Sequence, residues 1–549
     1  MLTGHTCAGK TNLALGLERD YGYFRIKTSD VVRKHAAVRN YEPDRKFLQE
    51  FGDDLDREFG SKWIFNYVDG EVTNNPQCRK FVVDSIRTAK QLEFFRAHRE
   101  AKIIHVHLFA GENHLRARFD QKYGGDTGYN SADIIKRESD IKRFKEDADI
   151  RINVEGTYGS DTLVRVAAQL NLYPAPETKN VDVIVGGQFG SEGKGHIAAY
   201  LSSEYDYLMR VGGPNAGHTV SGKKDIFTYH QLPSGSKDTD AKILLGPGMT
   251  IYVPKLIEEI EACSITSERL FIDPNAMIIS DEDIENEETL RRTIGSTKSG
   301  SGAATARRIM GRSDSSAKLA KDVMELRPYV GEGPHYRGSS IPILERAFRN
   351  NQSLLLEGTQ GSALSIYHGP YPHVTSRDTN VAGCLAEAGI PPSRVRRVVM
   401  VVRPNPIRVA DPDGDEGHSS GELKGLTSFR EIAEQSGLHR ETLEKNEVTS
   451  TTGRDRKVGK FDWELFRRSC SLNAPTDLVL TFADYIDADN VKARRFGRLS
   501  QETQKFIEDL ERVALVPVSM ISIRFPRSEE ERQDPRSIID RRTWRTNPH

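Results

Sequence analysis

The sequence predicts an α/β protein made of two parallel-sheet domains of the phosphate-loop type in tandem. Two glycine-rich loops carry a lysine, GHTCAGKT at residues 4–11 and GGQFGSEGKGH at 186–196. Over 1–172, short β-branched runs alternate with charged helical stretches, as is typical of a parallel sheet. A strand pattern then restarts at Val181, after the polar, proline-bearing segment LYPAPETKN. These three observations together predict the tandem arrangement.

Length and composition are those of an ordinary globular chain with more than one core. At 549 residues the chain exceeds what a single core holds, and length alone predicts two to four domains. Net charge is −1 with 29% charged residues, which argues against nucleic-acid or membrane-surface partners. The five cysteines are scattered without zinc-ligand spacing, as expected of reduced thiols. With no long apolar run and no signal peptide, we expect a cytoplasmic protein.

The first loop matches the G-x-x-x-x-G-K-[ST] phosphate-loop pattern completely. In such a loop Gly4 and Gly9 let backbone N–H groups turn toward phosphates. Lys10 reaches the terminal phosphates, and Thr11 binds Mg²⁺. Only Met1 and Leu2 precede Gly4, so we expect the strand that feeds the loop to be very short. An accidental glycine-rich loop is the alternative interpretation.

Three segments after this loop resemble the small phosphate-loop nucleoside monophosphate kinases, especially deoxynucleotide and dephospho-coenzyme-A-like kinases: GYFRIKTSDVVRK (22–34), WIFNYV (63–68) and VVDSIRTAKQLEFFR (82–96). The resemblance implies a kinase-like domain over 1–172. In that family the acceptor nucleotide is held by the segment that matches Ser29, Asp30 and Arg33. Asp84 and Arg87 would lie near the phosphates and the metal, and Arg116 and Arg118 would belong to a lid. A helix-capping Asp with a surface Arg remains the alternative for Asp84 and Arg87. A domain that only binds or hydrolyses nucleotide remains the alternative to a kinase.

The second loop is a weak signal alone, but its companions occur in a fixed order. They are VGGPNAGHTV (211–220), HQLPSG (230–235), GSTKSGSGAATARRIMGR (295–312), EGTQGSALSIYHGPYPHVTSRDT (357–379), TSTTGRDRKVGKFD (449–462) and LTFAD (480–484). Together with the loop they resemble adenylosuccinate synthetase over 181–526. That resemblance implies a ligase that joins the amine of L-aspartate to the 6-carbon of a purine monophosphate, with nucleoside triphosphate cleavage. Residues 173–180 are then a linker and 527–549 a polar tail.

The resemblance also implies site residues. Catalytic roles fall to Ser191, Lys194, His218 and Gln360: Lys194 binds the transferring phosphoryl group, and His218 acts as acid on the 6-oxygen. Mg²⁺ lies at the carbonyl of Gly217 and at Ser191. The remaining nucleotide and phosphate contacts are Gly190, Glu192, Gly193, Gly195, Asn215, Ala216, Thr297, Arg312, Thr375 and Asp484. Thr451, Thr452, Arg454 and Arg456 hold the aspartate carboxylates, because an arginine fork suits a dicarboxylate.

Three departures from the family pattern bear on the substrates. Ser191 stands where the family has the aspartate that removes the N1 proton of hypoxanthine, and a serine hydroxyl does not act as a carboxylate base near neutral pH. This substitution resembles the bacteriophage branch of the family, which uses deoxyguanylate. Phe482 replaces a lysine that packs on the donor's guanine, and the C-terminal turn reads SIRFP (522–526), so ATP or dATP becomes an expected donor beside GTP. Ser365 and Tyr367 replace family aspartates with an unassigned effect.

Three hypotheses follow. The first is a bifunctional enzyme whose ligase takes dGMP or GMP and whose first domain is a nucleotide kinase. The second is an ordinary IMP-dependent adenylosuccinate synthetase with an accessory kinase, and the third is a nucleotide-sensing protein with an inactive ligase site. Retention of Lys194, His218 and Gln360 argues against the third. We expect a homodimer, because in the family an arginine near the position of Arg312 completes the partner's site.

Overall fold

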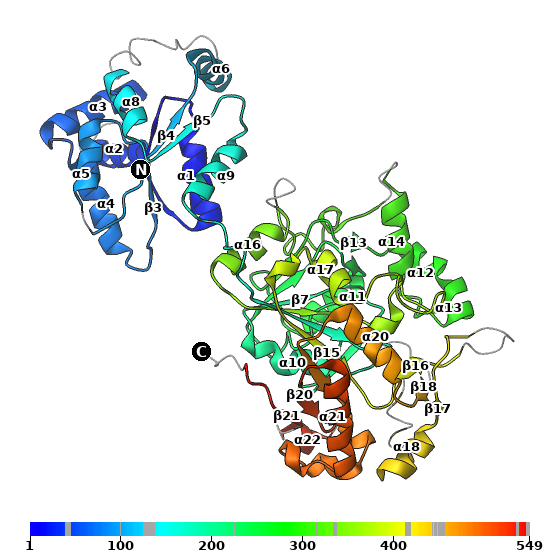
Figure 1. Cartoon of the computed structure of the whole chain (residues 1–549). Helices are drawn as coiled ribbons and strands as arrows, with labels where there is room; N and C mark the ends of the chain where they lie inside the picture. Colours follow the sequence, from blue (N-terminus) through cyan, green and yellow to red (C-terminus); the bar gives the residue numbers. More distant parts are fainter. Residues whose placement is uncertain are drawn as a thin grey trace. The chain divides into compact units, whose positions relative to one another are not determined.

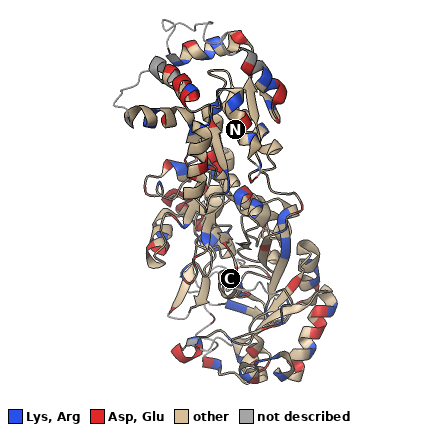
Figure 2. Cartoon of the chain, turned by 90° about the vertical axis from the view of Figure 1, so that its left-hand side faces the viewer, with Lys and Arg blue, Asp and Glu red and all other residues tan. Residues whose placement is uncertain are grey.

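The computed structural model describes the chain except for the following residues: 39–44, 99, 124–137, 223–224, 313–316, 333–337, 412–418, 442, 444–446, 448–455, 527, 534–536 and 545–549. The chain divides into two compact units, Met1–Tyr173 and Pro174–His549 (Figure 1). Among the described residues no helix has both the length and the apolar character needed to cross a membrane. Lys and Arg (blue) and Asp and Glu (red) are both scattered over the helices that face the viewer in Figure 2.

Unit 1 is built on short parallel strands with the first loop at their carboxyl edge. Strand β1 (Leu2–Gly4) pairs with β4 (Val106–Phe109), β4 pairs with β5 (Ile150–Asn153), and β2 (Phe24–Lys27) pairs with β3 (Phe81–Asp84), all in parallel. The Ile86 N–H just beyond β3 donates to the Leu2 carbonyl at 2.9 Å, which places β3 beside β1. Strand β1 thus lies between β3 and β4, so the strand order reverses at β1. Ligands of open α/β sheets bind at such a switch point.

Helices pack around these strands because their apolar residues recur on one face. Leu13 and Leu17 of the helix after the loop are buried with Leu163 and Val166 of the last helix, against Leu108 of β4. The described helices of unit 1 are α1 (Lys10–Tyr21), α2 (Thr28–Val38), α3 (Arg45–Glu58), α4 (Trp63–Asn74), α5 (Ala89–Ala97), α6 (Glu112–Tyr123), α8 (Glu138–Asp147) and α9 (Gly159–Gln169).

Unit 2 is organised around a nine-stranded sheet with the order β12-β10-β7-β14-β6-β15-β19-β20-β21, as counted over the described residues. All neighbouring pairs are parallel except β20 and β21. Every residue of β6 is buried, because helices cover both faces of a parallel sheet. The strands are β6 (Val181–Gly186), β7 (Tyr207–Arg210), β10 (Lys242–Leu245), β12 (Leu270–Ile272), β14 (Leu354–Glu357), β15 (Val395–Val402), β19 (Asp477–Leu480), β20 (Val518–Ser522) and β21 (Ile538–Asp540).

Smaller sheets and helices surround this sheet. The smaller strands are β8 (His218–Ser221) with β9 (Ile226–Tyr229), β11 (Thr250–Ile251) with β13 (Met277–Ile278), and β16 (Ile407–Val409) and β17 (Leu426–Thr427) on either side of β18 (Arg456–Gly459). The described helices are α10 (Lys194–Leu201), α11 (Val253–Ala262), α12 (Asp281–Asn286), α13 (Glu288–Ile294), α14 (Ser301–Met310), α16 (Ile341–Arg349), α17 (Val381–Ala388), α18 (Phe429–Ser436), α20 (Trp463–Asn473), α21 (Gln501–Ala514) and α22 (Glu529–Gln533). Strands β6, β14, β15, β19 and β20 end at one edge of the large sheet, and the second loop lies there.

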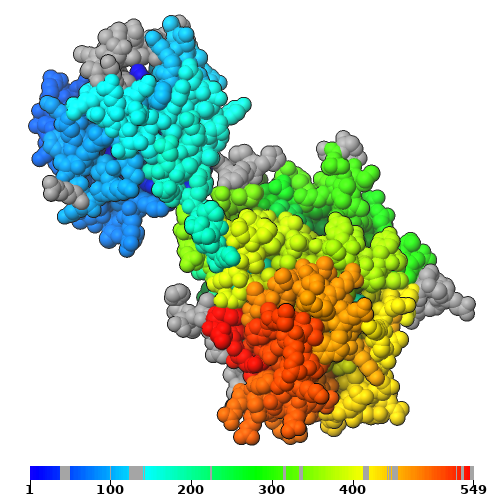
Figure 3. Space-filling view, viewed as in Figure 1, coloured from blue at the N-terminus to red at the C-terminus, as the bar shows by residue number. Residues whose placement is uncertain are grey.

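The C-terminal segment differs from the polar tail expected over 527–549. Strand β21 pairs antiparallel with β20 at the edge of the large sheet. Beyond it, Arg542 forms an ion pair with Glu204 at 2.6 Å, and the Trp544 indole N–H donates to Asp477 at 2.8 Å. In the space-filling view the red C-terminal residues lie against the orange-red segment of the same unit (Figure 3). The expectation of a tail is therefore wrong for 538–544, because a three-residue strand with two isoleucines suffices at the sheet edge and the flanking polar residues find partners.

Residues 174–180, expected as part of a linker, lie with unit 2. The Arg394 guanidinium donates to the Thr178 carbonyl at 3.2 Å. The Asn180 side chain donates to the Gln352 carbonyl at 2.5 Å. These contacts fix the start of β6, and with it the strand that carries the second loop.

Candidate active site

The second loop joins the end of β6 to the start of α10. Gly193 caps α10 with φ 83°, in the left-handed region that glycine adopts without strain. Gly190 has φ 104°, and a Cβ there would lie 3.0 Å from the Gln360 Cα. The loop therefore packs directly on the turn after β14, and this contact requires glycine.

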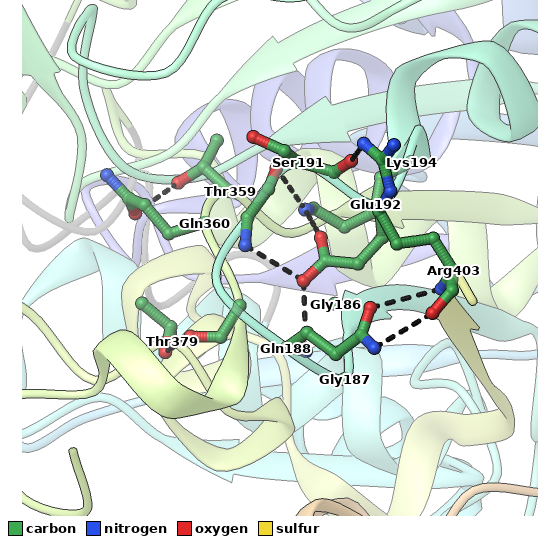
Figure 4. Close-up of polar contacts among 12 residues, drawn as sticks. Gly186, Gly187, Gln188, Ser191, Glu192, Lys194, Thr359, Gln360, Thr379 and Arg403 are labelled. Carbon is green, nitrogen blue, oxygen red and sulfur yellow. Dashed lines mark hydrogen bonds and ion pairs between the residues drawn. The ribbon is translucent and has the colours of Figure 1, made fainter. Parts of the chain in front are cut away.

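An acidic side chain holds the second loop from inside (Figure 4). The Glu192 carboxylate accepts from the N–H groups of Gln188 at 2.9 Å and Gly190 at 2.8 Å. Its other oxygen lies 2.7 Å from the Lys194 ammonium, which also donates to the Gly190 carbonyl at 3.1 Å. Glu192 and Lys194 are both buried. The charged pair fixes the lysine at the helix start, where phosphates bind in loops of this type.

His218 lies against the start of α10 and is held by a carboxylate. A Cβ on Gly195 would lie 2.6 Å from the His218 Cβ, so the two residues are in close contact. The His218 Nδ1 lies 2.6 Å from Glu357, whose carboxylate also accepts from the backbone N–H and hydroxyl of Ser234. Burial and the positive charge of Arg210 lower the pKa of His218, while His218 and Arg210 lower the pKa of Glu357 against the opposing effect of burial. Glu357 thus accepts from Nδ1 and leaves the buried Nε2 without a hydrogen-bond partner among the described residues, so that it can meet a substrate.

Ser191 is half-exposed, and its backbone is tied to a buried arginine network. The Ser191 carbonyl accepts from Arg403 at 3.0 Å (Figure 4). Arg403 also pairs with Glu447 at 3.0 Å. Glu447 also pairs with Arg456 at 2.7 Å and accepts from the Tyr485 hydroxyl. Arg403 and Arg456 lower the pKa of Glu447 although burial opposes the shift. The network connects the second loop to strand β18, which carries one of the arginines expected to bind aspartate.

A cavity of about 350 Å³ opens beside the loop that carries His218. Asn215 lines it, with a buried side-chain oxygen that has no hydrogen-bond partner among the described residues. Arg308, Arg377 and Ser376 also line it. The Arg377 guanidinium pairs with Glu387 at 2.6 Å and lies 3.5 Å from the Gln360 side-chain oxygen. The cavity combines an apolar lining with Arg308, Arg377, Ser376 and Asn215, a mixture that is typical of small-ligand sites.

The remaining expected residues of unit 2 are distributed around this region. Thr297 lies between α13 and α14, Thr375 in the segment after β14, and Asp484 just beyond β19. Arg312 follows α14 and is exposed. The Ala216 carbonyl accepts from Arg210 at 2.5 Å, which orders the loop containing Asn215 and Gly217. Of the expected aspartate-binding residues, Thr451, Thr452 and Arg454 lie outside the described residues, whereas Arg456 begins β18.

The first loop has its own lysine site in unit 1. Gly9 caps α1 with φ 92°, and a Cβ on Gly4 would lie 2.1 Å from the Leu108 carbonyl oxygen. The Lys10 ammonium donates to the carbonyls of Gly4 and His5, both at 2.8 Å. Burial lowers the pKa of Lys10 to about 8, although the nearby Asp84 raises it. A lysine held by carbonyls at a helix N-terminus suits an incoming phosphate.

Oxygen atoms suited to Mg²⁺ lie beside both loops. In unit 1 the buried Asp84 Oδ2 has no hydrogen-bond partner among the described residues, and Thr11 is exposed at the start of α1. In unit 2 Ser191 and Gly217 offer a hydroxyl and a carbonyl. Hard oxygen donors are what Mg²⁺ prefers, and substrate phosphates and water complete such sites. In the described part of the chain no group of three or more His, Cys, Asp or Glu residues is placed to hold a metal ion by itself.

The other kinase-like residues of unit 1 are engaged locally. Asp30 pairs with Arg33 at 2.7 Å on the surface of α2. Arg118 donates to the Thr157 carbonyl at 3.1 Å, whereas Arg116 is exposed. The backbone N–H of Arg87 donates to Gln91 at 2.9 Å.

Sequence reasoning missed Glu357, Arg403 and Glu447. Each is a buried charged residue, and Glu357 ends an apolar strand while Arg403 follows one. A charged residue at the carboxyl end of a buried strand is a signal that can be read from sequence, because burial of a charge requires a partner. The identity of that partner cannot be read in the same way.

The fold and this site define a nucleotide-binding α/β enzyme, with a parallel sheet whose carboxyl edge carries a lysine loop and an acid–base pair. The model of the family "Adenylosuccinate synthetase" matches residues 183–327 and 314–492. The chain belongs to the adenylosuccinate synthetase family, and its second unit is an aspartate–purine ligase of that family. The family model covers none of residues 1–182.

Curated relatives and solved structures agree with this assignment. Adenylosuccinate synthetase of Methanocaldococcus jannaschii is 34% identical over 348 residues, covering 62% of this chain and 93% of the relative. That of Pyrococcus horikoshii is 36% identical over 349 residues, covering 62% and 94%. Cyanophage S-2L succinoaminodeoxyadenylate synthetase, PurZ, bound to dGMP and dATP as an energy donor, is similar at a TM-score of 0.52 with 27% identity, covering 67% of this chain and 96% of that chain. Plasmodium falciparum adenylosuccinate synthetase shares the fold at a TM-score of 0.54 with 21% identity, covering 66% and 100%.

Proposed function

We propose that unit 2 joins L-aspartate to the 6-position of a guanine nucleotide, dGMP or GMP, with cleavage of a nucleoside triphosphate. The products are 2-amino-N6-succinyl-(deoxy)adenylate, a nucleoside diphosphate and phosphate. Ser191 is the observation that carries the choice of guanine: a hydroxyl stands where a carboxylate is needed to take the N1 proton of hypoxanthine. The similarity to a cyanophage enzyme bound to dGMP and dATP supports both this acceptor and an adenine donor.

The residues of the site suit a two-step reaction. The donor's γ-phosphoryl group transfers to the purine 6-oxygen, and the aspartate amine then displaces the phosphate from carbon 6. Lys194, fixed by Glu192, lies where it would hold the transferring phosphoryl group. His218, held at Nδ1 by Glu357, directs Nε2 to the 6-oxygen and, in its protonated form, donates to the charge that develops there. Mg²⁺ bound at Ser191 and Gly217 would neutralise phosphate charge.

The aspartate substrate requires a second charged site. Arg456, paired with the buried Glu447, would receive one substrate carboxylate at the start of β18. Glu447 also forms an ion pair with Arg403, and the Arg403 guanidinium donates to the Ser191 carbonyl. The same carboxylate therefore contacts both the proposed aspartate site and, through Arg403, the second loop. The 5′-phosphate would lie with Thr297 and Thr375, and Arg312 of a second copy would complete the site in a homodimer.

A substrate panel tests this function. The protein would be incubated with L-aspartate, Mg²⁺, ATP or GTP, and each of IMP, dIMP, GMP and dGMP, and succino-nucleotides would be read by mass spectrometry. We expect the 2-amino product from dGMP or GMP in excess over any product from IMP or dIMP. Product from inosinates only would establish the ordinary synthetase, and no product with any acceptor would favour the nucleotide-sensing alternative.

For unit 1 we propose a nucleoside monophosphate kinase. The observation behind it is the combination of the complete first loop with Asp84, whose buried Oδ2 lacks a hydrogen-bond partner among the described residues. Transfer of radiolabel from γ-labelled ATP to a panel of monophosphates tests it. Labelled diphosphate supports a kinase, whereas release of labelled inorganic phosphate alone would show a nucleotide hydrolase.

A further inference from the structure

His196 is a buried histidine whose ring has no hydrogen-bond partner among the described residues. It lies on α10, two residues beyond Lys194, and is 9% exposed. Neither Nδ1 nor Nε2 has a partner in that part of the chain. A buried polar group without a partner destabilises the folded state, so its presence calls for a ligand or a role.

Two aromatic side chains lie near the start of α10. The His196 ring lies 5.5 Å from the Phe525 ring, at an interplanar angle of 57°. Just before α10, a Cβ on its N-cap residue Gly193 would lie 3.4 Å from the Phe482 ring. The N-cap and the first turn of α10 therefore each lie beside an aromatic ring.

The sheet order places these aromatic residues at the carboxyl edge that carries the second loop. Phe482 follows β19 and Phe525 follows β20, and these strands are parallel neighbours. Parallel strands end at one edge, where nucleotides bind in folds of this kind. The Phe482 backbone has φ 53°, an unfavourable conformation for a bulky side chain that is most often retained at functional sites.

The chemistry of this surface fits a purine. Aromatic rings stack on a base face, and Phe482 is itself backed by the Arg403 guanidinium at 4.1 Å. Burial lowers the pKa of His196 to about 4, so near neutral pH the ring is uncharged and offers one N–H donor and one lone pair. The edge of adenine carries an amino donor and a ring-nitrogen acceptor, and one His196 nitrogen can bond to either of them.

We propose that His196 is a specificity-determining residue that hydrogen-bonds the base of the nucleoside triphosphate donor, between Phe482 and Phe525. The inference rests on the proposed ligase function of unit 2. It deepens that function, because the residue that recognises the donor base then lies on the same helix as the phosphate-binding Lys194. This one helix, α10, would contact both the phosphate and the base of the donor.

The test uses the full chain carrying Lys10→Ala, so that the first loop does not bind the nucleotide being measured. His196→Phe keeps a planar ring beside Phe525 and removes both nitrogens, whereas His196→Gln restores one donor and one acceptor. Tyr200→Phe, on the same helix, is the matched control, since its hydroxyl contacts Asp540 and not the loop. The readouts are the KM of each substrate, kcat, and the Kd of a non-hydrolysable ATP analogue by calorimetry.

For His196→Phe we expect the KM and Kd for ATP to rise about tenfold, the loss of one hydrogen bond, with kcat and the other two KM values within about twofold. His196→Gln should recover part of the affinity, and Tyr200→Phe should behave as the parent. An unchanged ATP affinity in His196→Phe, or an equal change in all three KM values, would overturn the inference. A parent protein that binds the analogue but forms no succino-nucleotide would refute the proposed function instead, and the comparison of Kd values would still test His196.

Discussion

Replacing Glu357 by glutamine isolates the part that the buried carboxylate plays in the chemistry at His218. One Glu357 oxygen accepts from the backbone N–H of Ser234 at 2.8 Å, and the other lies 2.6 Å from His218 Nδ1. In Glu357→Gln the amide oxygen must stay on the Ser234 N–H, because an NH₂ group cannot accept. The NH₂ group then faces Nδ1, which forces the ring proton onto Nε2 and disfavours the imidazolium.

The size of the effect follows from the bond that is lost. A hydrogen bond to a charged group contributes about 1.5–3 kcal/mol, which corresponds to roughly a 10- to 150-fold fall in kcat if it acts in the transition state. Because the side chains are isosteric and His218 remains in place, the KM values should change less than threefold. Removing the carboxylate also lowers the pKa of His218 further, so the alkaline fall of kcat should begin at lower pH than in the parent.

The assay is steady-state formation of succino-nucleotide over a pH series, with a thermal melt of each protein. Glu259→Gln is the matched control, a buried carboxylate in the same unit that accepts from the backbone N–H groups of His230, Gln231 and Leu232. We expect it to lower stability without a shift in the pH profile. Equal kcat values for parent and Glu357→Gln, or the same pH shift in the control, would refute a role for Glu357 in positioning His218.

Three further expectations concern the loops, the donor and the assembly. Lys10→Ala should abolish phosphoryl transfer by unit 1 while leaving ligase kcat within about twofold. In the parent, the nucleotide affinity of the first loop should fall as the pH rises above about 8, because Lys10 loses its proton there. Calorimetry over pH 7–10 would measure this fall. Phe482→Lys should shift the donor preference from ATP toward GTP. An equal ratio of the KM for ATP to the KM for GTP in parent and variant would show that Asp484 alone determines which donor base is bound. Mixing inactive Arg312→Leu and Lys194→Ala chains should restore part of the activity through hybrid sites, whereas a strictly monomeric active protein would contradict the dimer.

Local patterns explain why both loops were predictable from sequence. Glycines at fixed spacing before a lysine specify a strand–loop–helix unit without help from distant residues, and α1 and α10 begin at Lys10 and Lys194, each after a left-handed glycine. The buried strand before the second loop is apolar except for Asp182, as parallel strands are largely apolar.

Partnerships between distant residues were not predictable. His218 and Glu357 are separated by 139 residues, and Arg403 and Glu447 by 44 residues. Nothing in either local sequence selects the partner, because the pairing is set by how distant segments of the chain pack together. The C-terminal strand was missed for a related reason: its three residues lie in a polar context, and only the exposed edge of β20 makes them a strand.

The acceptor preference of Ser191→Asp tests the central claim most directly. Parent and variant would be compared with dGMP and IMP at equal concentration, and the ratio of kcat/KM values measured. If serine replaces a base that only hypoxanthine needs, the parent should prefer dGMP, and the variant should lose dGMP turnover while its IMP turnover stays equal or rises. A well-placed proton acceptor contributes about 10²–10⁴ in rate, so the change in the ratio should be large. A parent that prefers IMP over dGMP by a clear margin would contradict the account.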